Sequence, residues 1–227
     1  MKRYQFLIVF AVLLAAPAAS AQVGNAPFCL AGRNWEGLIL KMNYSQQAWD
    51  LDSDCCSCDL QFNDWVEANR ITGKTFYHFG TGTHHVVGLR QAELGNAVFA
   101  ITASKREYDT YVALVTEYPP VAKSYLAYFG DIYLSDSRLL PVVDAVTLFH
   151  LCEFSQPNTV SAEYGGLTDR GLLDLMTGKT RPGGHILFYT GSNGWRATKA
   201  LLPAWEEEQP VERFRQFKRL KVYRKTG

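Results

Sequence analysis

The chain has 227 residues, a length suited to one medium-sized domain or to one domain with an extension. Hydrophobic residues make up 47% of it and charged residues 20%, which is ample apolar surface for a packed core and excludes a disordered or collagen-like chain. The formal net charge of +1 gives no indication of nucleic-acid binding.

The first 21 residues have the three parts of a secretory signal. Lys2 and Arg3 form a short basic start, residues 6–16 are apolar, and residues 19–21 follow the small-x-small pattern that precedes cleavage. The apolar stretch is too short to span a bilayer comfortably. We therefore predict a cleaved signal peptide over residues 1–21, no stable membrane span after cleavage, and a secreted or periplasmic location. An uncleaved anchor is the alternative.

Residues 22–61 are predicted to form a loop-rich N-terminal extension. All five cysteines of the chain follow the signal, and four of them precede residue 62. In an oxidising compartment we expect a disulfide from Cys29 to Cys55, Cys56 or Cys58, and the odd number leaves at least one cysteine unpaired. Metal binding is the alternative, although this cysteine group lacks the paired two-residue spacings of a zinc ribbon.

From residue 62 onward, predicted strands and helices alternate. Units of roughly 25 residues imply right-handed crossovers and a mainly parallel sheet with helices on both faces. The predicted fold is therefore a three-layer α/β sandwich that forms one domain over residues 62–227. The expected helices span 62–70, 84–94, 105–115, 168–176 and 201–208, the expected strands span 75–79, 98–102, 125–129, 142–151 and 185–190, a turn lies at 181–184, and one or two closing strands lie within 212–225.

A glycine turn follows the first predicted strand. In KTFYHFGTGTHHVV, residues 74–87, Gly80-Thr81-Gly82 lies between a strand and a helix. In a parallel sheet, ligands bind beyond the carboxyl ends of the strands, where glycines let the backbone approach a ligand and a helix N-terminus offers free N–H groups. We predict a cofactor-binding turn. A metal-binding histidine cluster and a turn that simply needs small residues are the alternatives.

Polar residues also lie at the ends of the third and fourth predicted strands. Asp131 follows the third strand, where a carboxylate can accept a hydrogen bond from an exocyclic amine, and His150 ends the fourth. Together with the PGG turn at 182–184, these segments resemble the class I S-adenosylmethionine-dependent methyltransferases, from about residue 62 to the C-terminus. The tail RFRQFKRLKVYRK looks like the antiparallel hairpin of that family.

The resemblance implies a Rossmann-like methyltransferase sheet that binds the small-molecule cofactor S-adenosylmethionine and an unknown acceptor. The sequence also departs from the family pattern: His78 replaces an acid before the first glycine, His84 replaces the third glycine, and no carboxylate follows the second strand until Glu107. Carried over by position, the cofactor-binding residues would be Phe79, Gly80, Thr81, Gly82, Thr102, Asp131 and Ile132.

His150 and Glu153, in the segment HLCEF, are the predicted catalytic residues. A histidine with a pKa near its usual value of about 6.5 can act as a general base; a residue that merely packs at the strand end is the alternative. Cys152 would need a neighbouring base to act as a nucleophile. Histidines gather near several strand ends, but adjacent histidines on a helix point in different directions, so we predict no metal site.

Two functions from different classes agree with these features. The first is a methyltransferase that binds S-adenosylmethionine and aligns an acceptor with it. The second is an exported, catalytically inactive domain of the same fold that uses the cleft or its surface as a binding module. The departures from the family pattern and the signal favour the second function, and the order of glycine turn, Asp131 and PGG turn favours the first. The sequence does not specify the oligomeric state.

Overall fold

The computed structural model describes residues 45–54, 56–154 and 166–227, all within the unit Leu40–Gly227. The predicted signal peptide, most of the predicted extension, Cys29 and Cys55 lie outside the described residues, so the signal and the disulfide remain predictions. Cys58, one of the candidate disulfide partners, is a free thiol. Within the described ranges, no helix is long and apolar enough to cross a membrane.

A seven-stranded sheet organises the described chain, with the strand order β3-β2-β1-β4-β5-β7-β6. Strands β1 to β5 pair in parallel, and β7 runs antiparallel to both of its neighbours. The predicted fold class, including the C-terminal antiparallel hairpin, is confirmed. The strands are β1 Thr75–Phe79, β2 Ala97–Thr102, β3 Tyr125–Phe129, β4 Val143–Thr147, β5 Thr180–Tyr189, β6 Val211–Phe217 and β7 Leu220–Lys225.

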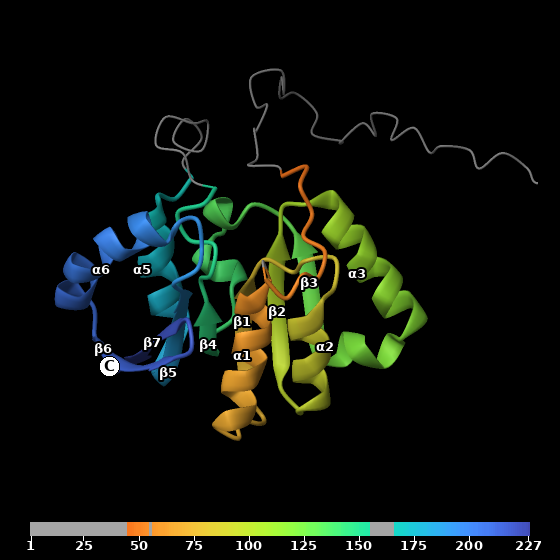
Figure 1. Cartoon of the computed structure of the whole chain (residues 1–227), viewed down its shortest axis with the longest axis horizontal. Coiled ribbons are helices and arrows are strands. Elements are labelled where there is room, and N and C mark those ends of the chain that lie inside the picture. The colour runs from red at the N-terminus through yellow and green to blue at the C-terminus, as the bar shows by residue number, and fades with distance from the viewer. Residues whose placement is uncertain (1–44, 55, 155–165) are drawn as a thin grey trace, which may run out of the picture. The chain divides into compact units, whose positions relative to one another are not determined.

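Helices cover both faces of the sheet (Figure 1). One face packs against α1 Ser57–Ala68, α2 Val86–Glu93 and α3 Lys105–Glu117, and the other against α5 Asp169–Lys179 and α6 Trp195–Glu208. Short 3₁₀ helices are η2 Pro119–Lys123, η3 Ile132–Leu134 and η4 Ser137–Leu139. Thr168 caps α5, since its Oγ1 accepts a hydrogen bond of 3.0 Å from the N–H of Gly171.

Two apolar cores, one on each face, follow from the alternation of side chains along the strands. Phe76 of β1 packs with Phe62 and Trp65 of α1, whereas the next residue, Tyr77, packs in the core that contains Trp205 of α6. Both cores are rich in fully buried aromatic and branched side chains. They bury both faces of the sheet, whereas its carboxyl edge carries polar groups.

Helix α1 begins at Ser57, so the predicted helix over residues 62–70 starts five residues too late. The reason is that its inner face is not purely apolar. Asp59 and Asn63 are buried beside the apolar residues of the helix, at 5% and 6% exposure, and two buried polar residues obscure the helical periodicity. Helix α6 likewise begins at Trp195, six residues before its predicted start.

Two predictions about the central strands are wrong. Strand β4 ends at Thr147, and the buried residues that follow it form a turn rather than the predicted strand to residue 151. Strand β5 begins at Thr180, so the predicted turn at 181–184 lies inside a strand, where the register with β4 shifts. Gly184 is required there because a Cβ atom would lie 2.6 Å from the carbonyl oxygen of Asp144.

The segment of residues 45–54, called here the strap, lies along the carboxyl edge of the sheet. Ser45 forms a parallel bridge with Ser104, and the N–H of Thr83 donates to the carbonyl of Trp49 at 2.7 Å. Asp50 pairs with Arg106 at 3.1 Å. Part of the predicted extension is therefore tied to the glycine turn and to the ends of β2 and α3.

Candidate functional site

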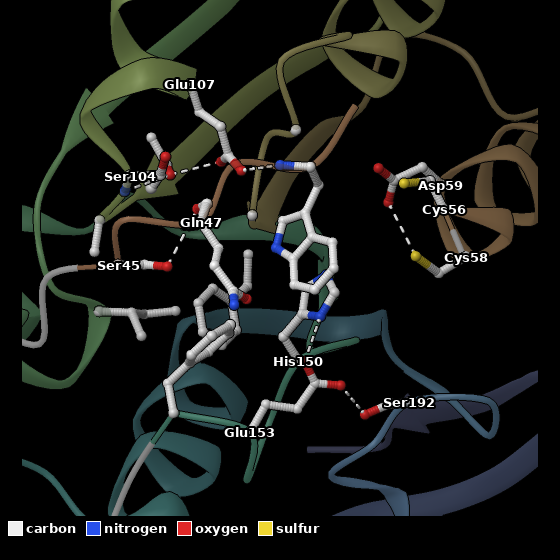
Figure 2. A pocket seen from close by; sticks show the side chains of 18 of the residues that line it. Ser45, Gln47, Cys56, Cys58, Asp59, Ser104, Glu107, His150, Glu153 and Ser192 are labelled. Carbon is white, nitrogen blue, oxygen red and sulfur yellow. Dashed lines mark hydrogen bonds and ion pairs between the residues drawn. The ribbon is translucent and has the colours of Figure 1, made fainter. Parts of the chain in front are cut away.

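A cavity of about 220 Å³ opens where β1 to β5 end (Figure 2). Because parallel strands end at the same edge, residues distant in sequence meet there. Thr81 was predicted to bind cofactor, but it is not among the lining residues; its side chain is buried, and its Oγ1 donates to Glu107 at 3.0 Å. The cavity is lined by the other predicted site residues, which are Phe79, Gly80, Gly82, Thr102, Asp131, Ile132, His150 and Glu153.

The glycine turn makes room for the protein's own histidines. Gly80 and Gly82 have φ values of +91° and +56°, a region that favours glycine. A Cβ atom on Gly82 would lie 2.2 Å from Nε2 of His84, and one on Gly80 would lie 3.1 Å from the ring of His150. The two glycines therefore allow imidazole rings to pack against the turn, which was not among the predictions for this motif.

Neither histidine of the His84-His85 pair lies on the helix, contrary to prediction. Helix α2 begins at Val86, and His85 precedes it with a φ of +48°. The ring of His85 is fully partnered, with Nδ1 2.9 Å from the hydroxyl of Tyr125 and Nε2 2.8 Å from that of Thr110. His85 is thus a buried structural residue, and burial lowers its pKa to about 4.

His84 presents a buried hydrogen-bond donor to the cavity. The backbone N–H of Val86 donates to Nδ1 of His84 at 3.2 Å, so Nδ1 is an acceptor. Burial lowers the pKa of His84, which favours the neutral ring, and the proton of that ring must then be on Nε2. The side chain is 7% exposed, and Nε2 has no hydrogen-bond partner among the described residues.

Asp59 of α1 supplies a carboxyl group that faces two histidines. Its Oδ1 lies 3.6 Å from Nε2 of His78, and its Oδ2 lies 3.8 Å from Nε2 of His84. Burial raises the pKa of Asp59 to about 7, and the neighbouring charge of His150 only partly opposes this. Burial also lowers the pKa of His78 to about 3, so that ring is neutral.

Glu107 supplies a second buried carboxylate, from the first turn of α3. It is 2% exposed and lines the cavity. Its Oε1 accepts from the N–H of Trp49 at 3.1 Å, and its Oε2 accepts from the hydroxyls of Thr81 and Thr102 at 3.0 and 2.7 Å. Glu107 therefore joins the strap, the glycine turn and the end of β2.

His150 and Glu153 form a hydrogen-bonded pair, as Figure 2 shows. Nδ1 of His150 lies 3.0 Å from Oε2 of Glu153, and Oε1 of Glu153 accepts from Ser192 Oγ at 2.6 Å. Burial by itself would lower the pKa of His150, but the hydrogen bond and charge of Glu153 outweigh it and raise that pKa. Burial would raise the pKa of Glu153, but the hydrogen bond and charge of His150, with Ser192, hold it below its usual value.

These partners determine the chemistry of the His150 ring. A carboxylate only accepts hydrogen bonds, so Nδ1 of neutral His150 carries the proton and Nε2 keeps a free lone pair. The two cavity imidazoles thus have opposite roles, since His84 offers a donor and His150 offers a base. The thiol of Cys152 is no nucleophile here, because burial raises its pKa to about 11.

Asp59 was not predicted as a site residue, and Glu107 was noted only as a late carboxylate. The acids of the family pattern are absent at position 78 in β1 and just after β2, whereas Asp59 and Glu107 bring carboxyl groups to the cavity from helices α1 and α3. An acid on the inner face of a short helix before the glycine turn was the only available signal for Asp59. In the described part of the chain, no group of three His, Cys, Asp or Glu residues is arranged to hold a metal ion.

Comparison with solved structures places this fold in a known class. The N-methyltransferase NodS from Bradyrhizobium japonicum WM9, in complex with S-adenosyl-L-homocysteine, is 12% identical with a TM-score of 0.51, over 77% of this chain and 87% of that chain. Another structure of NodS gives a TM-score of 0.54 at 12% identity, over 78% of this chain and 100% of that one. The fold is that of the class I S-adenosylmethionine-dependent methyltransferases.

The same fold also occurs in a protein with another reaction. The [4+2]-cyclase SpnF is 17% identical with a TM-score of 0.50, over 75% of this chain and 64% of that chain. Neither the family models nor the curated proteins give a match. At these identities the likeness shows the fold alone, and the reaction has to be argued from the cavity.

Proposed function

We propose that the protein is an S-adenosylmethionine-dependent methyltransferase that acts on a small molecule. The observation that carries this proposal is the convergence of residues after four successive strands on one cavity. Gly80, Thr102, Asp131 and His150 follow or end β1, β2, β3 and β4, and all four line it. In open parallel sheets this edge is the ligand site, and the structural neighbour NodS is described with S-adenosyl-L-homocysteine.

The residues present fit the adenosine half of the cofactor. Ser104, just after β2, has a buried Oγ without a hydrogen-bond partner among the described residues, so a ligand hydroxyl would satisfy it. The Asp131 carboxylate lines the cavity after β3, next to the buried apolar side chain of Ile132. The cofactor would supply an electrophilic methyl group at a sulfonium.

His150 is the proposed proton acceptor of the site. Its Nε2 lone pair faces the glycine turn, and Glu153 holds the ring through Nδ1 and stabilises the imidazolium that protonation would form. Ser192 in turn fixes the other oxygen of Glu153. In this proposal His150 is an oriented general base with a raised pKa, and Glu153 is the residue that orients it.

A binding module without catalysis is the second candidate, and two observations favour it. The ring of His84 packs against Gly82, where the resemblance places the cofactor. Glu107 is also engaged by the strap and two threonines. Both features compete with a bound cofactor for the same turn.

Isothermal titration with S-adenosylhomocysteine tests the proposal. We expect micromolar binding by the full chain and at least about tenfold weaker binding, about 1.4 kcal/mol, by Asp131→Ala. Asp136→Ala is a matched control: Asp131 and Asp136 cap η3 and η4 in the same way, accepting from backbone N–H groups at 2.9 and 2.8 Å, but Asp136 does not line the cavity. This control should bind like the wild type.

Absence of heat at millimolar ligand would exclude the cofactor and leave the binding module. Equal loss of affinity in both variants would show that the effect comes from the caps rather than from ligand contact. Export is proposed separately, from the signal-like composition of residues 1–21. A fusion to a reporter that is active only outside the cytoplasm tests it, and an inactive reporter would refute it.

A further inference from the structure

A donor and an acceptor face each other across a few ångströms in the part of the cavity near α1. The donor is Nε2–H of His84, buried and without a partner among the described residues, and the acceptor is Oδ2 of Asp59, 3.8 Å away. The distance exceeds that of a direct hydrogen bond. Both residues line the cavity.

We propose that His84 and Asp59 form a recognition site for a hydroxyl group, so that the small-molecule substrate is an alcohol or a phenol. One oxygen atom can lie within normal hydrogen-bonding distance of both residues, about 2.8 Å from each. It would accept from Nε2–H of His84 and donate its own proton to Oδ2 of Asp59. That the bound hydroxyl compound is the substrate rests on the proposed function, whereas the existence of the hydroxyl site does not.

When Asp59 is ionised, elementary hydrogen-bonding rules exclude several other common groups. A protonated amine has no lone pair for the His84 donor, and a carboxylate has no proton for Asp59 and would be repelled by its charge. An ether or a carbonyl accepts only, which leaves Oδ2 unmatched. A hydroxyl group both donates and accepts through a single atom, which the separation of 3.8 Å requires.

The surroundings hold the two side chains in place. Nδ1 of His84 is fixed by the N–H of Val86, and the thiol of Cys58 lies 3.5 Å from Oδ1 of Asp59. Figure 2 shows Asp59 with Cys58 on α1, beside the cavity. The groups that interact with Asp59 include Cys58 of its own helix, His78 of β1, His84 of the glycine turn, His150 after β4, Glu107 of α3 and Tyr125 of β3.

Fragment binding followed by NMR of the histidine side chains tests the proposal. Phenol is titrated into the full chain without cofactor, with anisole and toluene as matched probes that lack the hydroxyl proton or the oxygen. We expect phenol to shift the Nε2–H resonance of His84 and to bind at least about tenfold more tightly than anisole. Because the acceptor is a carboxylate, this preference should increase from pH 6 to pH 8.5, while phenol stays un-ionised.

Two variants separate recognition from general packing. Asp59→Asn should reduce the preference for phenol over anisole at least about fivefold and abolish its pH dependence. Asp64→Asn is the matched control on the same helix, since Asp64 pairs with Lys218 at the surface and does not line the cavity. His84→Phe identifies the resonance; should that variant fail to fold, assignment by through-bond NMR in the wild type replaces it.

The outcomes distinguish this inference from the proposed function. Equal binding of phenol and anisole, or an unchanged preference in Asp59→Asn, would overturn the hydroxyl site even where S-adenosylhomocysteine binds. A clear preference for phenol that depends on Asp59 would support the site even where S-adenosylhomocysteine does not bind. In that case the cavity would serve the binding module.

Discussion

Glu107 offers the sharpest test of how the cavity is held together. Its carboxylate accepts hydrogen bonds from the N–H of Trp49 and from the hydroxyls of Thr81 and Thr102. In Glu107→Ala these three donors lose their acceptor. Each buried donor left unsatisfied costs roughly 1–3 kcal/mol, so three of them should lower the free energy of unfolding by at least about 3 kcal/mol.

Urea unfolding of the full chain, followed by circular dichroism, measures this loss. For a chain of this size it corresponds to a decrease of about 6–12 °C in the melting temperature. Asp109→Ala is the control in the same helix, because Asp109 is exposed and pairs with Lys105, which is worth about 0.3–0.5 kcal/mol. If the losses in free energy of unfolding of Glu107→Ala and of this control differ by less than about 1 kcal/mol, the carboxylate does not organise the cavity.

Three further changes test the electrostatics and the glycine turn. Glu153→Gln removes the charge that raises the pKa of His150, so that pKa should fall below about 6.5, and an unchanged NMR titration would contradict the pairing. Asp59 has a folded pKa of about 7, above its unfolded value of about 3.9. Folding therefore favours its protonated form. As the pH rises from about 4 to 7, the free energy of unfolding of the wild type should fall by up to about 4 kcal/mol relative to that of Asp59→Asn; the same pH dependence in both proteins, measured by urea unfolding, would refute this. Gly82→Ala should destabilise by more than about 1 kcal/mol, because φ is positive and an imidazole ring occupies the space of its Cβ. Gly178→Ala, in helix α5 with open space around it, should stabilise by about 0.5–1 kcal/mol, and similar melting temperatures for these two variants would show that the turn has no such restriction.

The strands were predictable because their signal is local. Runs such as TFYHF and AVFAIT are buried on both faces and read as β-branched and aromatic stretches, and they form β1 and β2 within one residue of the predicted ends. Their alternation with helices implied a parallel sheet, and parallel strands must end at one edge. The positions of Gly80, Asp131 and His150 at the cavity followed from that topology.

Element boundaries at the cavity were less predictable, since polar residues interrupt the periodicity there. Helix α1 was predicted to start too late because Asp59 and Asn63 are on its buried face. The two adjacent histidines were assigned to a helix, but His85 adopts a left-handed conformation that its tertiary contacts with Tyr125 and Thr110 stabilise. Tertiary contacts of this kind produce no recognisable pattern in the neighbouring sequence.

The sequence by itself therefore determined the layered parallel fold and the edge at which the cavity lies, since both follow from periodicity and chain direction. Only the tertiary structure decided which acids serve that edge, because Asp59 and Glu107 arrive from helices that packing brings to the cavity. It also decided the roles of the two imidazoles. The proton of each neutral ring is placed by its partner, Val86 for His84 and Glu153 for His150, and such pairings exist only in the folded chain.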